Sequence, residues 1–400
     1  MNGFMGYKRS DGRVGIRNHV AVLAAMDNCS SIVRNIAAQV RDVLPLTIWY
    51  GRGQYGADEE LTFRTLAGMG ANPNLHSVLV VSLEPVSAKK LAKAIVELSG
   101  KRVETITVQE CGNSISAVAA GVEIAMDMVA QASEQQREWA GIDKLVMAVE
   151  CGGSDTTSGI GSNPVLGKVA DWVVDNGGTV VLSETSEFLG AEHILAGRAV
   201  NEEVRRKILA IVNNVEEQAN ARGVSILGAN PVPDNIAGGL TTIEEKSLGA
   251  IIKGGSRPVQ GVLEYAEPPR GAGLHLMDTP APALESMTGL AAGGVQVILF
   301  STGKGNIVGC PICPTAKITA NPVTAKRMAP NVDLDVCDVF YGNATAEEGA
   351  GPLRDLLIRI CNGRKTRAEI LGNEDIALNR IQPTVLPAGR EAAGRIRWPG

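Results

Sequence analysis

The strongest constraint on the fold is a regular alternation of short apolar runs with amphipathic segments along the chain. The runs are rich in Val, Ile and Leu, and each is followed by glycine, proline or polar residues. We expect strands at His19–Ala24, Leu46–Trp49, Val78–Leu83, Val103–Val108, Leu145–Val149, Val180–Ser183 and Val295–Phe300. This alternation predicts an α/β fold of parallel-sheet strand–helix units, arranged in two domains with glycine-rich loops at the strand ends.

The segments between these runs carry helix signals. Apolar residues recur at helical spacing from Ile32 to Leu44, and a second such segment runs from Ser87 to Gly100. Further helices are expected from Pro164 and over 201–221. The polar stretch at 133–137 then predicts a boundary between an N-terminal α/β domain, residues 1–140, and a C-terminal α/β catalytic domain, residues 141–400, with an irregular tail.

Composition narrows the class of protein. The chain has 46 glycines but only four Trp, five Tyr and five Phe, so we expect many tight turns or close approaches of backbone to a ligand, and no base-stacking surface. A net charge of −5 gives no attraction to nucleic acid. Seven cysteines, a polar start and no apolar run of about 20 residues predict a cytoplasmic protein without nucleic-acid or membrane partners.

A polar, glycine-rich phrase follows the strand expected at Leu145–Val149. It reads Glu150-Cys151-Gly152-Gly153-Ser154-Asp155 and continues through hydroxyl residues to Pro164. The carboxyl ends of parallel strands are where α/β proteins bind ligands, and paired glycines let backbone N–H groups approach an anion. We therefore predict a ligand-binding loop here.

A second set of ionisable residues follows the strand at Val180–Ser183. Glu184, Glu187, Glu192 and His193 lie within ten residues, which is enough for a metal site or an acid–base pair. The alternative is a capped helix start that carries Glu192 and His193 on its surface.

Two more glycine loops complete the candidate set. Asp234 and Asn235 precede Gly238-Gly239 and a helix start, which suits an anionic or metal-bound ligand. Lys304 follows the strand at Val295–Phe300 in a loop that lacks P-loop spacing, where a lysine can hold a carboxylate or neutralise an enolate.

Other motifs have simpler explanations beside the functional one. Arg13 and Arg17 lie four residues apart and could grip a carboxylate, or they could be solvated arginines of an N-terminal turn. Cys310 and Cys313 form a Cys-x-x-Cys pair, but no second pair with zinc-ribbon spacing exists, which favours packing or chance.

Taken together, these phrases resemble the altronate/galactarate dehydratase family. The opening phrase, residues 6–18, looks like the start of that family's large domain. The resemblance runs in the family's order from about residue 4 to 340 and continues through 151–155, 158–164, 190–193, 238–249, 277–280, 300–305 and 314–317.

The resemblance implies a lyase that removes water from a sugar acid or related 2-hydroxy carboxylate to give a 2-keto acid. It also implies a divalent metal, iron(II) or manganese. The same family includes the large subunit of sulfolactate sulfo-lyase, which expels sulfite, and a non-catalytic ligand-binding descendant is a further alternative.

Within this framework we assign expected roles to particular residues. Catalytic roles are predicted for His193, Asp155, Glu184 and Lys304. Substrate binding is predicted for Arg13, Arg17, Gly152, Gly153, Ser154, Asp234 and Asn235, and metal binding for Cys29, Cys151 and Glu192. The expected partners are a small anionic hydroxy-acid substrate, a small subunit of about ninety residues and further copies of the chain.

The sequence departs from the family pattern in two places. Sugar-acid dehydratases of this type carry a small N-terminal domain before the shared region, which here begins almost at Met1, so that domain is expected as a separate subunit or as lost. The family's His-x-x-Gly-Cys phrase is replaced by residues 47–54, and a Gly-Cys-Glu phrase by Leu83-Glu84-Pro85. Two of the family's expected metal ligands therefore have no counterpart.

Overall fold

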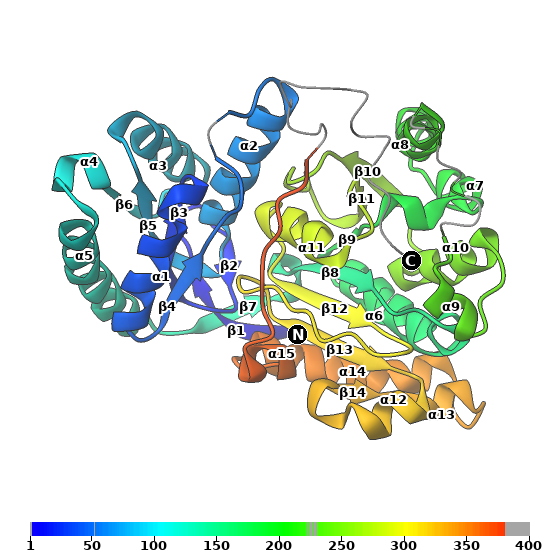
Figure 1. The fold of residues 1–400 in the computed structure, drawn as a ribbon. Helices are drawn as coiled ribbons and strands as arrows, with labels where there is room; N and C mark the ends of the chain where they lie inside the picture. The colour runs from blue at the N-terminus through cyan, green and yellow to red at the C-terminus, as the bar shows by residue number, and fades with distance from the viewer. Residues whose placement is uncertain (1, 52, 222, 224–225, 227–229, 381–400) are drawn as a thin grey trace.

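The chain folds into two lobes, each built on a parallel sheet (Figure 1). The structure is a computed structural model that describes residues 2–51, 53–221, 223, 226 and 230–380. The α/β class predicted from the alternating pattern is confirmed, because every pair of neighbouring strands in both large sheets is parallel.

The N-terminal lobe holds a four-stranded sheet of order β4-β3-β5-β6. Its strands are β3 (His19–Ala24), β4 (Val43–Leu46), β5 (Leu75–Ser82) and β6 (Arg102–Thr107). Its helices are α1 (Ser30–Gln39), α2 (Ala57–Ala71), α3 (Pro85–Ser99), the short α4 (Val108–Cys111) and α5 (Ser114–Glu134). Helix α1 packs on α5 and α2 packs on α3, so two helix pairs cover the sheet.

The C-terminal lobe holds a seven-stranded sheet of order β10-β11-β9-β8-β12-β13-β14. Its strands are β8 (Val146–Cys151), β9 (Thr179–Leu182), β10 (Val259–Leu263), β11 (Gly273–Met277), β12 (Val297–Ser301), β13 (Thr315–Thr319) and β14 (Leu334–Asp335). Its helices are α6 (Asn163–Asp175), α7 (Glu192–Gly197), α8 (Glu202–Ala221), α9 (Pro233–Ala237), α10 (Ile243–Ile251), α11 (Ala283–Ala292), α12 (Pro322–Arg327), α13 (Cys337–Phe340), α14 (Ala346–Cys361) and α15 (Arg367–Leu371).

A small antiparallel sheet joins the start of the chain to the segment between the lobes. Strand β1 (Gly3–Lys8) pairs with β2 (Val14–Gly15) on one side and with β7 (Glu138–Gly141) on the other. The first residues of the chain therefore lie against the crossing point from one lobe to the next.

The two lobes pack closely through α2 and α11. A Cβ at Gly68 of α2 would lie 2.3 Å from the carbonyl oxygen of Ala292, so only glycine permits this approach. Asn72 and Asn74, just after α2, are buried and donate their amide hydrogens to four backbone carbonyls of the C-terminal lobe. Buried amides with every donor used hold the lobes in one relative position.

Most expected elements are found, with shifts at their ends. Pro164 lies in the first turn of α6, and Gly100 ends α3 with φ of 63°, both as predicted. The helix expected up to Leu44 was wrong, because α1 stops at Gln39 and Val43 and Leu44 begin β4. Strands β10, β11 and β13 were not predicted, since polar residues and glycines interrupt their apolar pattern.

Helix α5 is long and apolar enough to cross a membrane by length and composition. It lies against α1 and strands β3, β5 and β6, and buries a stripe of small residues including Ala117, Gly121 and Ala125. A helix that covers one face of a sheet has the same composition.

Arg17 fastens the N-terminal segment to the C-terminal helices. Its guanidinium is buried and makes five hydrogen bonds, two to the Glu369 carboxylate of α15 and three to the carbonyls of Ile16, Ile360 and Arg364. A guanidinium has five N–H donors, so none is left for a substrate.

We predict that Arg17→Met destabilises the protein by about 3–5 kcal/mol, because it strands the Glu369 carboxylate in a buried site. Lys8→Met, which removes an exposed pair with Glu138, is the control and should cost less than about 1 kcal/mol. Denaturant unfolding at neutral pH measures both. Equal small losses would show that Arg17 does not hold this junction.

The same pair predicts a dependence on acid. Burial works against ionisation, but the bonds from Arg17 hold the pKa of Glu369 below its ordinary value. The stability from this pair is therefore present at neutral pH and is lost as the pH falls through the lowered pKa. In Arg17→Met, the free energy of unfolding should therefore fall less between neutral and acid pH than it does in the wild type.

Candidate functional site

The order of the seven strands reverses beside β8. The chain passes from β8 to β9 on one side and returns later to β12 on the other, so the crevice between the ends of β8 and β12 is a topological switch point. The Gly152–Gly153 loop lies in this crevice, where the Lys304 N–H donates to the Gly153 carbonyl and the Thr302 hydroxyl donates to that of Gly152. Gly153 has φ of 64°, which favours glycine.

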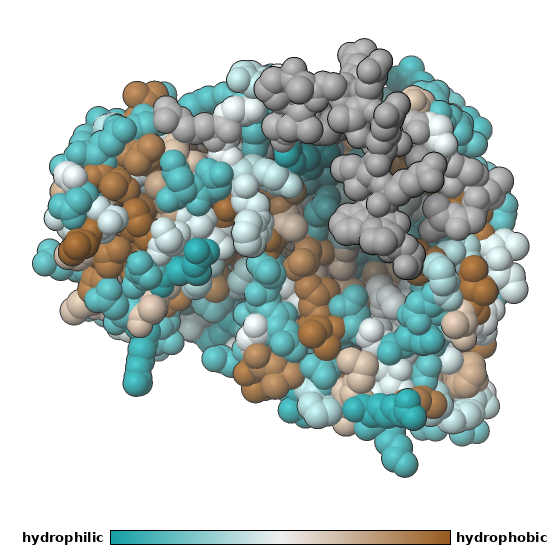
Figure 2. Space-filling model, in the orientation of Figure 1, coloured by the Kyte–Doolittle hydropathy of each residue, from teal (hydrophilic) through white to brown (hydrophobic). Residues whose placement is uncertain are grey.

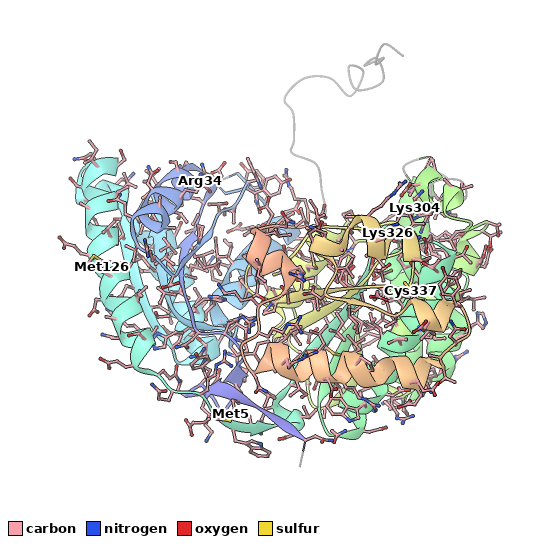
Figure 3. All side chains as sticks on the ribbon, turned by 90° about the horizontal axis from the view of Figure 1, so that it is seen from below. Met5, Arg34, Met126, Lys304, Lys326 and Cys337 are labelled. Carbon is pink, nitrogen blue, oxygen red and sulfur yellow. The ribbon has the colours of Figure 1, made fainter. Side chains whose placement is uncertain are left out.

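Several predicted residues meet at this crevice. The Asp155 carboxylate is buried and accepts from the Thr157 hydroxyl at 2.6 Å and from the Asn321 amide at 2.7 Å. Asn235 donates to the Ser154 carbonyl at 2.8 Å. Lys304 lies on the C-terminal lobe (Figure 3) and pairs with Asp234 at 3.1 Å. The glycine loops predicted from sequence thus form one polar edge.

A buried charged cluster lies next to this crevice, at the ends of β8 and β9. Lys253, in the 3-10 turn η5 (Ile252–Gly254) after α10, places its ammonium 2.5 Å from the Glu184 carboxylate and 3.1 Å from the Cys151 sulfur. Glu184 also accepts from the Cys151 backbone N–H at 3.0 Å. All three side chains are shielded from solvent.

The electrostatics of this cluster favour a charged lysine. Burial alone would lower the pKa of Lys253, but Cys151 and Glu184 raise it above its ordinary value. Burial and the Glu184 charge raise the pKa of Cys151 to about 12. Glu184 has φ of 72°, a strained conformation for a residue with a side chain, and such strain is typical of functional sites.

A second buried row lies on the other face of the same sheet. Glu150, Phe300 and Lys317 are cross-strand neighbours on β8, β12 and β13. Glu150 accepts from the hydroxyls of Ser183 and Ser286 at 2.8 Å each, and burial raises its pKa. Lys317 lies over the Phe300 ring, 3.2 Å from its centroid, and burial lowers its pKa.

A cavity of about 1,310 Å³ opens over the ends of β10 and β11. Its walls come from α8, from the ends of these strands and from α2 of the other lobe, and Figure 2 shows this face hollowed between the lobes, with hydrophilic side chains in the hollow. Cavities at a domain interface and at carboxyl strand ends are common ligand sites.

Two ionisable side chains of β11 and the residues after it line this cavity. Burial raises the pKa of the Asp278 carboxyl, which accepts from the Thr185 hydroxyl at 2.6 Å. Burial lowers the pKa of His275, whose Nε2 bonds the Gly271 carbonyl while its Nδ1 has no partner. With Nε2 as the donor, Nδ1 is a free acceptor.

The cavity wall is tied to the buried charged cluster. Thr279 accepts at its hydroxyl from the Glu184 backbone N–H at 2.8 Å, and the backbones of Thr185 and Thr279 are hydrogen bonded to each other. The Thr279 N–H also donates to the Thr185 hydroxyl. Glu184 and Lys253 therefore support the loops that present Asp278 to the cavity.

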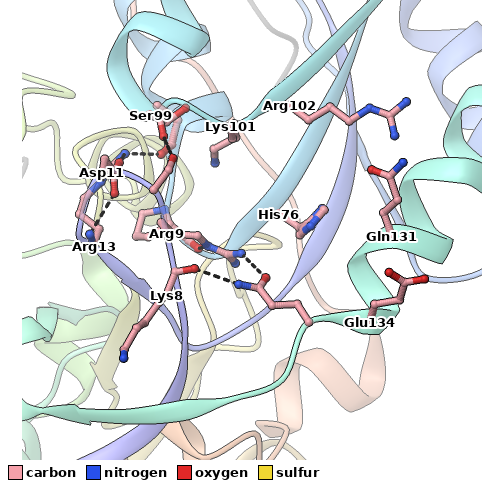
Figure 4. A pocket seen from close by; sticks show the side chains of 14 residues that line it. Lys8, Arg9, Asp11, Arg13, His76, Ser99, Lys101, Arg102, Gln131 and Glu134 are labelled. Carbon is pink, nitrogen blue, oxygen red and sulfur yellow. Dashed lines mark hydrogen bonds and ion pairs between the residues drawn. The ribbon is translucent and has the colours of Figure 1, made fainter.

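Other predicted residues lie elsewhere. Arg13 pairs with Asp11 at a basic pocket of about 500 Å³ near the amino ends of β5 and β6 (Figure 4). Arg17 has no free donor, because all five of its N–H groups are used within the protein. His193 is exposed on α7, which agrees with the alternative that the helix start carries it on its surface. Cys29 lies after β3 in the other lobe, where burial raises its pKa to about 11.

The expected metal ligands are not gathered. Cys29, Cys151 and Glu192 belong to three separate elements, and among the described residues no group of three or more His, Cys, Asp and Glu side chains could hold a metal ion. The Cys151 sulfur is instead in contact with the Lys253 ammonium, at 3.1 Å. Within the part of the chain that the structure describes, the residues present do not fit a metal site, and we derive no step through one.

The sequence reasoning missed Lys253, Asp278 and His275 as site residues. Lys253 lies in an apolar run just before Gly254-Gly255, and a lone lysine in such a run was the available signal. Asp278 belongs to a phrase that carried the family resemblance, and His275 is one of only four histidines. Asp278 and His275 depend on β11, which the pattern did not reveal, whereas Lys253 meets the ends of two strands that were expected but whose pairing with it is distant in sequence.

We predict that Lys253→Met lowers the free energy of unfolding by about 3–5 kcal/mol, because the Glu184 carboxylate is left buried without its partner. The double variant Lys253→Met/Glu184→Gln should recover part of the loss. Lys304→Met, which removes a partly exposed pair, should cost less than about 1 kcal/mol. A double variant less stable than Lys253→Met would contradict the pairing.

Comparison with known proteins places the chain in a family. Models described as D-galactarate/altronate dehydratase, C-terminal, and D-galactarate dehydratase/altronate hydrolase, second domain, match residues 142–384 and 6–133. The (2R)-sulfolactate sulfo-lyase subunit beta of Chromohalobacter salexigens is 41% identical over 380 residues, which cover 94% of this chain and 97% of that protein.

Two Escherichia coli enzymes are also similar. Altronate dehydratase is 32% identical over 372 residues, covering 90% of this chain and 74% of that protein. Galactarate dehydratase (L-threo-forming) is 30% identical over 383 residues, covering 90% and 73%. With both lobes matched and a polar edge at the switch point, the chain belongs to the D-galactarate/altronate dehydratase family, a family of lyases.

Proposed function

We propose that this chain is a lyase that removes the hydroxyl group β to the carboxylate of a 2-hydroxy acid, giving a 2-keto acid and water. The observation that carries the proposal is the interdomain cavity, which presents the Asp278 carboxyl of raised pKa in front of a buried charged cluster, with the buried His275 imidazole in its wall. Membership in a family of dehydratases and a sulfo-lyase supports the reaction class.

The elimination requires an acceptor for the α-proton and a donor for the leaving hydroxyl. We assign the acceptor to His275, whose neutral Nδ1 has no other partner, and the donor to Asp278, whose raised pKa favours the protonated form. The C–H bond breaks toward His275, the C–O bond breaks with the electron pair leaving as water after protonation by Asp278, and the enol formed tautomerises to the keto acid. Lys253 and Glu184 are positioning residues behind this wall.

Sulfite is a second candidate for the leaving group. It is favoured by the extent of the match, since the alignment covers 97% of the sulfo-lyase subunit but only 73–74% of the two dehydratases from Escherichia coli. In that case the C–S bond breaks and sulfite leaves with the electron pair. A small partner subunit would then be expected, because the similar protein is named as one subunit of an enzyme.

The test is a substrate panel on the purified chain, together with any chain that copurifies with it. Altronate, galactarate and (2R)-sulfolactate are supplied, and 2-keto acid and sulfite are measured separately, alongside the metal content. Keto acid without sulfite supports the hydro-lyase, and keto acid with sulfite supports the alternative. No keto acid from any of the three would reject the proposed function.

We predict that Asp278→Asn and His275→Asn each lower kcat/KM at least about a hundredfold, the usual effect of losing a proton-transfer group. Asp355→Asn, an exposed site on α14, should have little effect. In the wild type, kcat/KM should fall as the pH drops through the pKa of His275 and as it rises through that of Asp278. Loss of the alkaline limb in Asp278→Asn would identify the donor, and an unchanged profile would reject it.

A further inference from the structure

Arg64 reaches from the N-terminal lobe into the cavity of the C-terminal lobe. It lies on α2, and its guanidinium Nη1 is 2.5 Å from the carboxylate of Glu264, which directly follows β10. Both residues line the 1,310 Å³ cavity. The cavity is therefore completed by a cation from the other lobe.

The Arg64 guanidinium is not fully satisfied by the protein. Its Nε is buried and has no hydrogen-bond partner, and the same is true of Nε of Arg380, whose guanidinium lies over the Tyr50 ring, 4.4 Å from its centroid. Both arginines line the cavity. Both Nε atoms are closed to solvent, so a ligand in the cavity meets the accessible part of the Arg64 side chain, which is 41% exposed, rather than Nε itself.

The remaining cations of the cavity are already paired. Lys207 contacts Glu203 at 2.9 Å, and Arg270 contacts Glu267 at 3.2 Å. The Arg64–Glu264 pair is itself accessible, with side chains 41% and 72% exposed, so it contributes little by itself and an incoming anion can displace Glu264. Arg64 can thus exchange its pair with Glu264 for an anionic ligand that enters the cavity.

Arg64 lies on the same wall as the reacting groups. The Asp278 backbone N–H donates to the carbonyl of Leu263, the residue before Glu264, at 2.9 Å. The Glu264 charge also acts on the Asp278 carboxyl. A ligand whose C-2 end meets Asp278 and His275 can therefore extend along this wall to Arg64.

We propose that Arg64 is a specificity-determining residue that binds a second acidic group of the substrate, so that the cavity selects 2-hydroxy acids with an additional carboxylate or sulfonate. This inference rests on the proposed function, because it places the reacting end at Asp278. A 2-hydroxy acid with a single acidic group leaves Arg64 in its pair with Glu264.

Equilibrium binding to the full chain tests this directly by isothermal titration calorimetry, with every chain, including the reference, also carrying Asp278→Asn so that turnover of the probes is suppressed. The probes are galactarate with two carboxylates, (2R)-sulfolactate with a carboxylate and a sulfonate, and altronate with one carboxylate. We expect Arg64→Gln to weaken binding of at least one of the two-acid probes about tenfold, equivalent to about 1.4 kcal/mol, and altronate much less. Glu264→Gln, which removes the competing carboxylate, should tighten that same probe.

Arg270→Gln is the matched control, since Arg270 lines the same cavity but is 88% exposed and already paired. It should leave the two-acid preference unchanged. Equal losses for all probes in Arg64→Gln, the same effect in Arg270→Gln, or no preference for a two-acid probe in the reference chain would each overturn the inference. Thermal unfolding of each variant confirms that it is folded.

The two proposals fail in different ways. Binding that depends on Arg64, with no keto acid formed, would reject the proposed reaction and retain the anion site. Keto acid formed equally well by wild type and Arg64→Gln from every probe would reject the role of Arg64 and retain the reaction.

Discussion

The buried ion pair between Glu184 and Lys253 is the interaction on which the edge of the C-terminal sheet depends. Two charges taken out of water are tolerated only when their remaining hydrogen-bonding capacity is used, and here Cys151 supplies both a backbone N–H and a sulfur contact. The pair joins the ends of β8 and β9 to the turn after α10. Through Thr279 it also fixes the end of β11, where Asp278 meets the cavity.

The packing of the two lobes against each other positions the other side of the cavity. Buried amides of Asn72 and Asn74 and the close approach of Gly68 to Ala292 set the N-terminal lobe against the C-terminal lobe. Because α2 is held there, Arg64 reaches the cavity over β10 and β11. A polar wall then runs from Arg64 of one lobe to Asp278 of the other, and we propose that it binds an anionic hydroxy acid.

The sequence predicted the class of fold and part of the polar edge between β8 and β12, for physical reasons. Apolar runs report burial, so β3, β5 and β8 were found, and glycine loops at strand ends located Asp155, Asp234 and Lys304. The spacing of two residues does not show where their side chains point. Arg13 and Arg17 lie four residues apart, yet Arg13 lines the pocket at the amino ends of the strands and Arg17 pairs with Glu369 of α15. Lys253 stayed hidden because its charge is neutralised only by residues distant in sequence.

The most direct measurement of the central claim is a crystal structure of the protein with tartrate, a 2-hydroxy acid with two carboxylates. The account predicts tartrate in the interdomain cavity, with one end at Asp278 and His275 and the other carboxylate on Arg64. Tartrate bound instead at Lys304 in the crevice between β8 and β12, or in the basic pocket beside Arg13, would contradict it.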